Sequence, residues 1–229
     1  MIKAKLKKKE GDSTKKGYSS LWDFWFPLLF TFSLISLTRT YLAEPRYIPS
    51  GSMLPGLRIN DYLLIEKLTL LDRSPLKGEI VVFNSPFSFN QELLEGRDPS
   101  TINCFFNNIP YISIFAEPQP ACDAYIKRVV ATSGDQVIVS NKGELFIDGV
   151  FIEEPYVTNY CSEILGNLNQ CKSINDVVPD GHVLVLGDNR ANSYDGRYWP
   201  KNPFLPEKQI IGRAFFRFFP FDRTGLITP

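Results

Sequence analysis

Histidine is almost missing from this chain, since His182 is the only one among 229 residues. A zinc hydrolase of the HExxH type needs two histidines, so that class is excluded. A Ser-His-Asp site would have to use His182, which stands in residues 179–184 where a turn enters a strand. An exposed turn residue is the better interpretation of His182, and a catalytic base of another kind is favoured.

Metal-binding cysteine pairs are also absent. The four cysteines, Cys104, Cys122, Cys161 and Cys171, include no C-x-x-C pair, so a structural zinc site is not expected. Short loops close at the lowest entropic cost, which favours the disulfides Cys161–Cys171 and Cys104–Cys122 if the body faces an oxidising compartment. Four free thiols are the alternative.

A net charge of zero conceals an uneven distribution. Residues 1–16 contain seven lysines and two acidic residues, a net +5, which leaves −5 for the remainder. A body of that charge has no general basic field, which argues against nucleic acid as a partner. With 44% hydrophobic and 22% charged residues, the chain has the composition of a folded protein with one domain of ordinary size.

A long hydrophobic run is lacking as well, because the uncharged stretch at residues 24–38 has only 15 residues. A full membrane span needs about 20, and extension to Ala43 with snorkelling of Arg39 would supply the difference. Trp22, Trp25 and Tyr41 are placed where an aromatic belt would lie. We therefore predict an uncleaved transmembrane signal anchor over residues 21–43.

The seven lysines set the expected topology. By the positive-inside rule, residues 1–20 form a basic cytoplasmic tail and residues 44–229 lie outside the cytoplasm, at the plasma or inner membrane, with the lipid bilayer as a partner. A cleaved signal peptide is an alternative, but Tyr41 is too large for the −3 position of an A-x-A site. A buried core helix is another, yet it would not need the preceding lysines.

The body after residue 44 is predicted to be mainly β. Short apolar runs bounded by turn residues indicate strands at 62–65, 79–83, 125–131, 136–140, 144–147, 182–186 and 212–219. Asp148-Gly149 and residues 141–143 are typical of hairpin turns. Residues 87–121 and 156–177, rich in Asn, Pro and Ser, are interpreted as loop excursions. The expected fold is an antiparallel β domain preceded by one helix.

Without a suitable histidine, a serine nucleophile needs a lysine as its base. Only about 1 lysine in 2,500 is uncharged at pH 7 when its pKa is near 10.4, so that lysine must be buried among apolar groups. In the strand at 125–131, alternation places Lys127 on one face with Tyr125 and Val129, and Arg128 on the other. An edge-strand lysine that reaches solvent is the alternative interpretation of Lys127.

Two further segments could complete such a site. Ser50, Gly51 and Ser52 lie in a short turn between Pro49 and Pro55, which could present one hydroxyl for attack. Residues 187–197, Gly-Asp-Asn-Arg-Ala-Asn-Ser-Tyr-Asp-Gly-Arg, follow the strand at 182–186 and are dense in groups that fix a loop through side-chain bonds. Taken singly, each segment also fits an ordinary solvated loop.

Together these segments resemble the type I signal peptidases (leader peptidases), membrane serine proteases with a Ser-Lys dyad. The resemblance rests on five boxes in the family's order, from about Trp22 to Phe219. They are residues 49–53, 60–67, 78–83, 125–129 with Gly134-Asp135, and 187–197. It implies a coiled antiparallel β-sheet or barrel as the catalytic domain, and preproteins with signal peptides as substrates.

The resemblance also implies a role for individual residues. Ser52 matches the nucleophile, Lys127 the general base, Ser50 the oxyanion-hole hydroxyl that acts with the Ser52 N–H, and Ser193 the hydroxyl that orients the lysine. Asp195 and Arg197 match a supporting ion pair, with Asp188 and Arg190 in the same loop. The pockets for small P1 and P3 side chains match Ile48, Met53, Leu57, Tyr125 and Ile126.

The implied activity is cleavage of preproteins at A-x-A-type sites, with no cofactor and no metal. Two positions depart from the family pattern, because Gly56 and Gly196 stand where hydroxyl residues are common. A relative with a narrower set of substrates is one alternative. A membrane-tethered β-binding module without catalysis is another, although the complete set of Ser50, Ser52, Lys127 and Ser193 argues against it.

Overall fold

The computed structural model describes residues 16–86, 89, 124–161, 163–164, 167–168 and 171–228. The chain divides into two compact units, Met1–Leu42 and Ala43–Pro229. Most of the predicted excursion at 87–121, and the predicted Cys104–Cys122 pair, lie outside the described residues.

The first unit contains helix α1 (Lys16–Leu37), followed by the short π-helical segment η1 (Thr38–Leu42). The large apolar side chains along α1 are exposed, from Trp22 to Leu37. Where the chain is described, no helix is both long and apolar enough to cross a membrane, in contrast to the transmembrane anchor predicted over 21–43.

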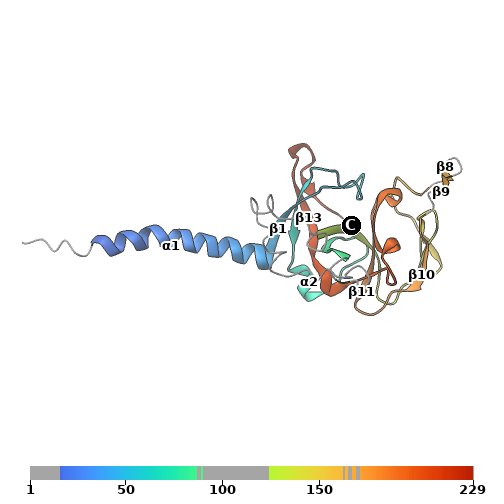
Figure 1. Cartoon of the computed structure of the whole chain (residues 1–229), viewed down its shortest axis with the longest axis horizontal. Helices are drawn as coiled ribbons and strands as arrows, with labels where there is room; N and C mark the ends of the chain where they lie inside the picture. Colours follow the sequence, from blue (N-terminus) through green and yellow to red (C-terminus); the bar gives the residue numbers. More distant parts are fainter. Residues whose placement is uncertain are drawn as a thin grey trace, which may run out of the picture. The chain divides into compact units, whose positions relative to one another are not determined.

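The second unit is built on an eight-stranded antiparallel sheet in the order β1-β2-β13-β3-β4-β11-β12, with β14 paired to β13 (Figure 1). Its strands are β1 (Ala43–Tyr47), β2 (Tyr62–Glu66), β3 (Ile80–Asn84), β4 (Ala124–Thr132), β11 (His182–Leu186), β12 (Phe204–Pro206), β13 (Ile210–Phe219) and β14 (Gly225–Leu226). The register of β13 shifts against both β2 and β3. Such bulges bend a strand and increase its twist, so they curve the sheet around its core.

A smaller antiparallel sheet has the order β10-β5-β6-β7, and β8 pairs with β9 alone. The bounds are β5 (Gln136–Val139), β6 (Leu145–Ile147), β7 (Val150–Ile152), β8 (Glu163–Ile164), β9 (Asn167–Leu168) and β10 (Ile174–Val177). Asp148 and Gly149 have φ of 52° and 79°, as a two-residue hairpin turn requires. Strands β8, β9 and β10 all lie within the loop excursion predicted over 156–177.

Short helical turns connect these strands. They are α2 (Thr69–Asp72), η4 (Arg190–Asn192), η5 (Gly196–Tyr198), η6 (Glu207–Gln209) and η7 (Phe221–Arg223).

The strands of these sheets confirm the prediction of a mainly β body. All seven predicted strands are present, and β11 has the predicted bounds. The sequence pattern does not predict strands β1, β7, β8, β9, β10, β12 and β14.

The segment that follows β1 is fixed to the core by its apolar side chains. Ile48, Met53 and Leu57 are buried and pack in one cluster with Leu63 and Ile65 of β2. The central strand β3 is buried from Ile80 to Phe83 because Ile80 and Val82 pack in this cluster on one face, and Val81 and Phe83 pack in a second cluster on the other. These contacts give the turn between Ile48 and Met53 a rigid base.

Candidate active site

The serine-containing turn is held at both ends by the backbone. Ile48 N donates to Asp61 O at 2.9 Å, and Leu57 N donates to Met53 O at 2.9 Å. Between these points Ser52 is buried, and its Oγ lies 3.5 Å from Ser50 Oγ. The two hydroxyls suggested by the sequence are therefore neighbours in a constrained turn.

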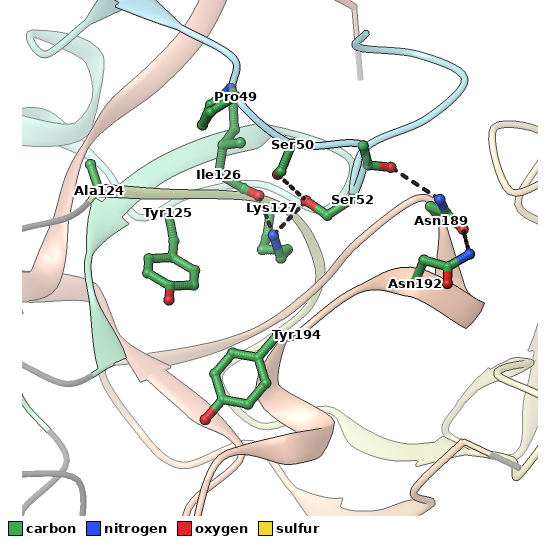
Figure 2. Close-up of a pocket in the computed structure, with 11 residues that line it drawn as sticks. Pro49, Ser50, Ser52, Ala124, Tyr125, Ile126, Lys127, Asn189, Asn192 and Tyr194 are labelled. Atoms are coloured by element: carbon green, nitrogen blue, oxygen red, sulfur yellow. Dashed lines mark hydrogen bonds between the residues drawn. The ribbon is translucent and has the colours of Figure 1, made fainter. Parts of the chain in front are cut away.

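Lys127 points from β4 at this turn. Its Nζ lies 2.8 Å from Ser52 Oγ and 2.8 Å from the carbonyl oxygen of Ile126. Figure 2 shows the amine pointing at the Ser52 hydroxyl. Only 4% of Lys127 is exposed. Among the described residues, no carboxylate forms an ion pair with this amine. The strand register brings it here, because Lys127 pairs with Val81 of the buried strand β3.

Burial lowers the pKa of Lys127 from 10.5 to about 8, because the ammonium loses its hydration. The negative charges of Asp195 and Asp188 act in the opposite direction, and the positive charge of Arg197 adds to the lowering. With a pKa near 8, about one amine in ten is uncharged at pH 7. An uncharged amine beside a serine hydroxyl can accept its proton.

A cavity of about 750 Å³ opens over these groups. It is lined by Pro49, Ser50, Gly51, Ser52, Ala124, Tyr125, Ile126, Lys127, Asn189, Asn192 and Tyr194 (Figure 2). Of the residues expected in the pockets, Tyr125 and Ile126 line the cavity. Ile48, Met53 and Leu57 lie in the apolar cluster described above and are not among the lining residues.

Sequence reasoning had given no individual role to Ala124 or to three other lining residues, Asn189, Asn192 and Tyr194. The last three belong to the loop at 187–197, so the density of polar residues there was the available signal. The side chain of Asn189 donates from Nδ2 to Gly51 O at 3.0 Å, and its backbone N donates to Ser52 O at 3.1 Å. The loop thus contacts the serine turn directly.

Ser193 lies next to the site but has no hydrogen-bond partner for its buried Oγ among the described residues. A Cβ placed on Gly187 would come within 2.2 Å of Ser193 Oγ and 2.6 Å of Ser52 O. Both serines therefore pack against the bare backbone of Gly187. The contact with the Lys127 amine that the resemblance implied is not formed in this state.

Two bidentate ion pairs support the loop. Asp195 and Arg197, both completely buried, are joined by contacts of 2.8 Å from Nε and from Nη2. Asp188 pairs in the same manner with Arg128, at 2.9 and 2.8 Å. Asp195 also accepts a bond of 3.0 Å from Gly187 N. Since two parallel bonds fix both distance and plane, the Asp188–Arg128 pair sets the position of the loop relative to β4, and the Asp195–Arg197 pair fixes the loop itself.

The base of the loop is fixed by further buried contacts. Arg190 pairs with Glu154 at 2.6 Å. Cys161 and Cys171 form a disulfide, with their Cα atoms 5.8 Å apart, and Arg197 Nη1 lies 2.7 Å from Cys171 Sγ.

His182 is remote from these groups, since it begins β11 and its Nδ1 contacts Asp180 O. In the described part of the chain, no group of three His, Cys, Asp or Glu side chains could hold a metal ion.

Comparison with known proteins shows which family this chain belongs to. Residues 21–219 match the family model described as signal peptidase, peptidase S26. The chain is 40% identical over 190 residues to a probable signal peptidase I-2 of Synechocystis, covering 83% of this chain and 69% of the relative. It is 37% identical over 191 residues to a signal peptidase I of Leptolyngbya laminosa, covering 83% and 76%. The chain therefore belongs to the peptidase S26 family of signal peptidases.

Proposed function

We propose that this chain is a serine endopeptidase that removes signal peptides from preproteins, with Ser52 as nucleophile and Lys127 as general base. The observation that carries the proposal is the contact of 2.8 Å between a buried lysine amine and a serine hydroxyl. Family membership supports the substrate class. The burial of Lys127 supports the role of base, because it lowers the pKa of the amine toward neutrality.

The reaction begins with attack of Ser52 Oγ on the scissile carbonyl carbon while its proton passes to the uncharged Lys127 amine. The resulting ammonium donates that proton to the leaving amine as the peptide bond breaks, which leaves an acyl-Ser52 ester. Water, deprotonated by Lys127, then attacks the ester, releases the signal peptide as a carboxylic acid and restores the Ser52 hydroxyl. The electron and proton balance needs no other group.

The oxyanion of each tetrahedral intermediate is stabilised by Ser50 Oγ–H and Ser52 N–H. Their placement in one constrained turn, with the two hydroxyl oxygens 3.5 Å apart, supports this assignment. We assign to Ser193 the role of orienting the Lys127 amine during the reaction, because its buried hydroxyl has no other partner among the described residues. Each preorganised donor of the oxyanion hole, such as the Ser50 hydroxyl, is worth about 10²–10³ in rate.

The substrate is an extended segment with small residues at P1 and P3, as in A-x-A sites. The cavity over Ser52 and Lys127 is bounded on one side by the end of β4 at Ala124–Ile126 and on the other by Asn189 and Asn192. An extended chain can bond to strand backbone along one such wall while alternate side chains enter the cavity.

The experiment is incubation of the purified full-length chain with a preprotein, followed by N-terminal sequencing of the product. Wild type should cut after the A-x-A residues, whereas Ser52→Ala should leave the preprotein intact. Ser133→Ala is the matched control, because Ser133 is exposed and, among the described residues, its hydroxyl bonds to the 179–180 turn. Cleavage by Ser52→Ala at the wild-type rate would overturn the proposal.

We also propose that α1 holds the chain at a membrane, with the catalytic unit outside the cytoplasm. The support is the exposure of large apolar side chains along the described helix, which in water would be costly. Full-length protein should float with lipid vesicles, and replacement of Phe30 and Leu34 by Asp should abolish flotation. Equal flotation of both proteins would contradict this assignment.

A further inference from the structure

The peptide group between Gly51 and Ser52 has a function at each end. Its N–H is the oxyanion donor assigned above, and its carbonyl oxygen accepts the bond of 3.0 Å from Asn189 Nδ2. Leu54 N also donates to this oxygen, at 3.2 Å, from within the turn itself. Asn189 is the partner that comes from elsewhere in the fold, 138 residues away.

The next peptide group is held by the same residue, because Asn189 N donates to Ser52 O at 3.1 Å. Asn189 therefore bonds to the peptide group on each side of the Ser52 Cα. A trans peptide is planar, with its C=O and N–H in opposite directions. A donor that fixes the Gly51 oxygen consequently fixes the direction of the Ser52 N–H, and it also polarises that N–H.

The amide of Asn189 is itself oriented by neighbours. Its Oδ1 accepts from Asn159 Nδ2 at 2.7 Å and from Asn192 Nδ2 at 3.4 Å. Because both neighbours donate, the Asn189 oxygen must face them and its NH₂ must face Gly51. Only 7% of Asn189 is exposed, so water offers little competition for these bonds.

We propose that Asn189 is the positioning residue of the oxyanion hole, which acts on the reaction by aiming the Ser52 N–H. The inference rests on the proposed function, and it adds a residue that does not touch the reacting atoms. Its loss should reduce the stabilisation of the tetrahedral intermediate without changing how the ground-state peptide binds. The expected signature is a lower kcat with an unchanged KM.

The test compares full-length Asn189→Ala with wild type and with Asn175→Ala, an exposed asparagine of β10. Steady-state cleavage of a preprotein should show kcat reduced about ten- to a hundredfold in Asn189→Ala. Its KM should remain within about twofold, and the midpoint of its pH profile should not move. Asn175→Ala should match wild type in all three values.

A second readout separates positioning from a purely structural role. A peptide aldehyde ending in alanine adds to Ser52 and places its oxygen in the oxyanion hole, so it imitates the intermediate. Asn189→Ala should bind this aldehyde more weakly by the same factor as its loss in kcat. Its affinity for the corresponding peptide amide should equal that of wild type.

The outcomes are distinct. A kcat equal to that of Asn175→Ala, or a change confined to KM, would overturn the assignment of Asn189. If Asn189→Ala does not fold, Asn189→Asp keeps the shape but lacks the donor to Gly51 O. At pH values above the midpoint of its own pH profile, Asn189→Asp should show the same loss of kcat. Full activity in that pH range would overturn the inference. Cleavage by Ser52→Ala would instead overturn the proposed function beneath it.

Discussion

Lys127 and Arg128 are adjacent in β4 and equally buried, at 4% exposure each, yet they lie in opposite electrostatic environments. The guanidinium of Arg128 is bound through two nitrogens by Asp188 and stacks on Tyr156, 3.9 Å from the ring centroid. The amine of Lys127 bonds to a hydroxyl and a carbonyl and lies 5.9 Å from the centroid of the Tyr125 ring, and no carboxylate among the described residues pairs with it. The face of Arg128 thus provides partners for a charged side chain, whereas the face of Lys127 disfavours the charged form of the amine.

The comparison shows that one strand accommodates two equally buried basic side chains in different ways. A buried charge is stable when a carboxylate and hydrogen bonds replace its water, and its pKa moves toward neutrality when they do not. The alternation of one strand is enough to separate the two situations by a single residue. The following experiments test the groups on the two sides of β4 and the glycines close to them.

The largest effect is expected from Lys127 itself. Lys127→Ala and Lys127→Arg should both lose cleavage, by more than about 10⁴-fold, because alanine has no base and arginine keeps its proton. Cleavage of a purified preprotein, with circular dichroism to verify the fold, measures this. Turnover by Lys127→Arg within tenfold of wild type would show that no uncharged side chain is needed there.

Gly187 lies beside the serine turn: its N–H donates to Asp195, and a Cβ added to it would meet Ser193 and Ser52. In Gly187→Ala the new Cβ would be 2.2 Å from Ser193 Oγ and 2.6 Å from Ser52 O, so the serine turn must move. We expect kcat/KM to fall about 10²-fold, as for a misplacement of about 1 Å. Gly225→Ala is the control, because a Cβ there meets nothing within 4 Å; equal activities would contradict the packing described.

Stability should respond in opposite ways to the same apolar replacement on the two faces. Arg128→Met leaves Asp188 buried and unpaired, which costs about 3–5 kcal/mol. Lys127→Met removes an unpaired amine and should be neutral or stabilising at pH 7. Urea unfolding measures both, and a Lys127→Met chain as unstable as Arg128→Met would contradict the comparison.

The pH dependence of that difference follows from the pKa. Folding lowers the pKa of Lys127 from 10.5 to about 8, so between these values the folded chain binds fewer protons than the unfolded chain. The cost, about 3 kcal/mol, is fully present below pH 8 and disappears as the pH rises to 10.5. Wild type should therefore gain stability relative to Lys127→Met across this window, and a constant difference would contradict it.

The two glycines that depart from the family pattern should give the smallest effects, and they should differ. In Gly196→Ser the Cβ would be 2.3 Å from Pro203 O, an overlap that costs about 1–3 kcal/mol. In Gly56→Ser the Cβ would be 3.4 Å from Asp188 Oδ2, which is near ordinary contact, and stability should change by less than about 0.5 kcal/mol. Thermal unfolding compares them, and equal losses would contradict this account.

The sequence pattern was sufficient to predict features that depend on neighbouring residues, such as strands and the alternation of their side chains. The apolar run at 182–186 became β11, and the alternation in β4 correctly separated Lys127 from Arg128. Strand β1 was missed because Glu44, Pro45 and Arg46 do not resemble a strand. It forms at the edge of the sheet, where proline is tolerated, and Glu44 is paired with Lys67 at 2.9 Å.

Contacts between distant segments could not be predicted from spacing. The bond from Asn189 to Gly51 depends on how the loop after β11 is set against the turn after β1, and the sequence contains no pattern for it. The same holds for the partner of Asp188, which is Arg128 across the sheet. The resemblance could propose Ser50, Ser52 and Lys127 because each lies in a compact box, whereas the cavity wall is assembled from three separate segments.

The pH profile of kcat/KM tests most directly whether Lys127 acts as an uncharged base. For the free enzyme this profile reports the pKa of the essential base. We predict activity that rises with pH and levels off above a midpoint of about 8, the value to which burial lowers the pKa of Lys127. A rate independent of pH between about 6 and 9, or a midpoint near 10.5 as for an exposed lysine, would contradict the account.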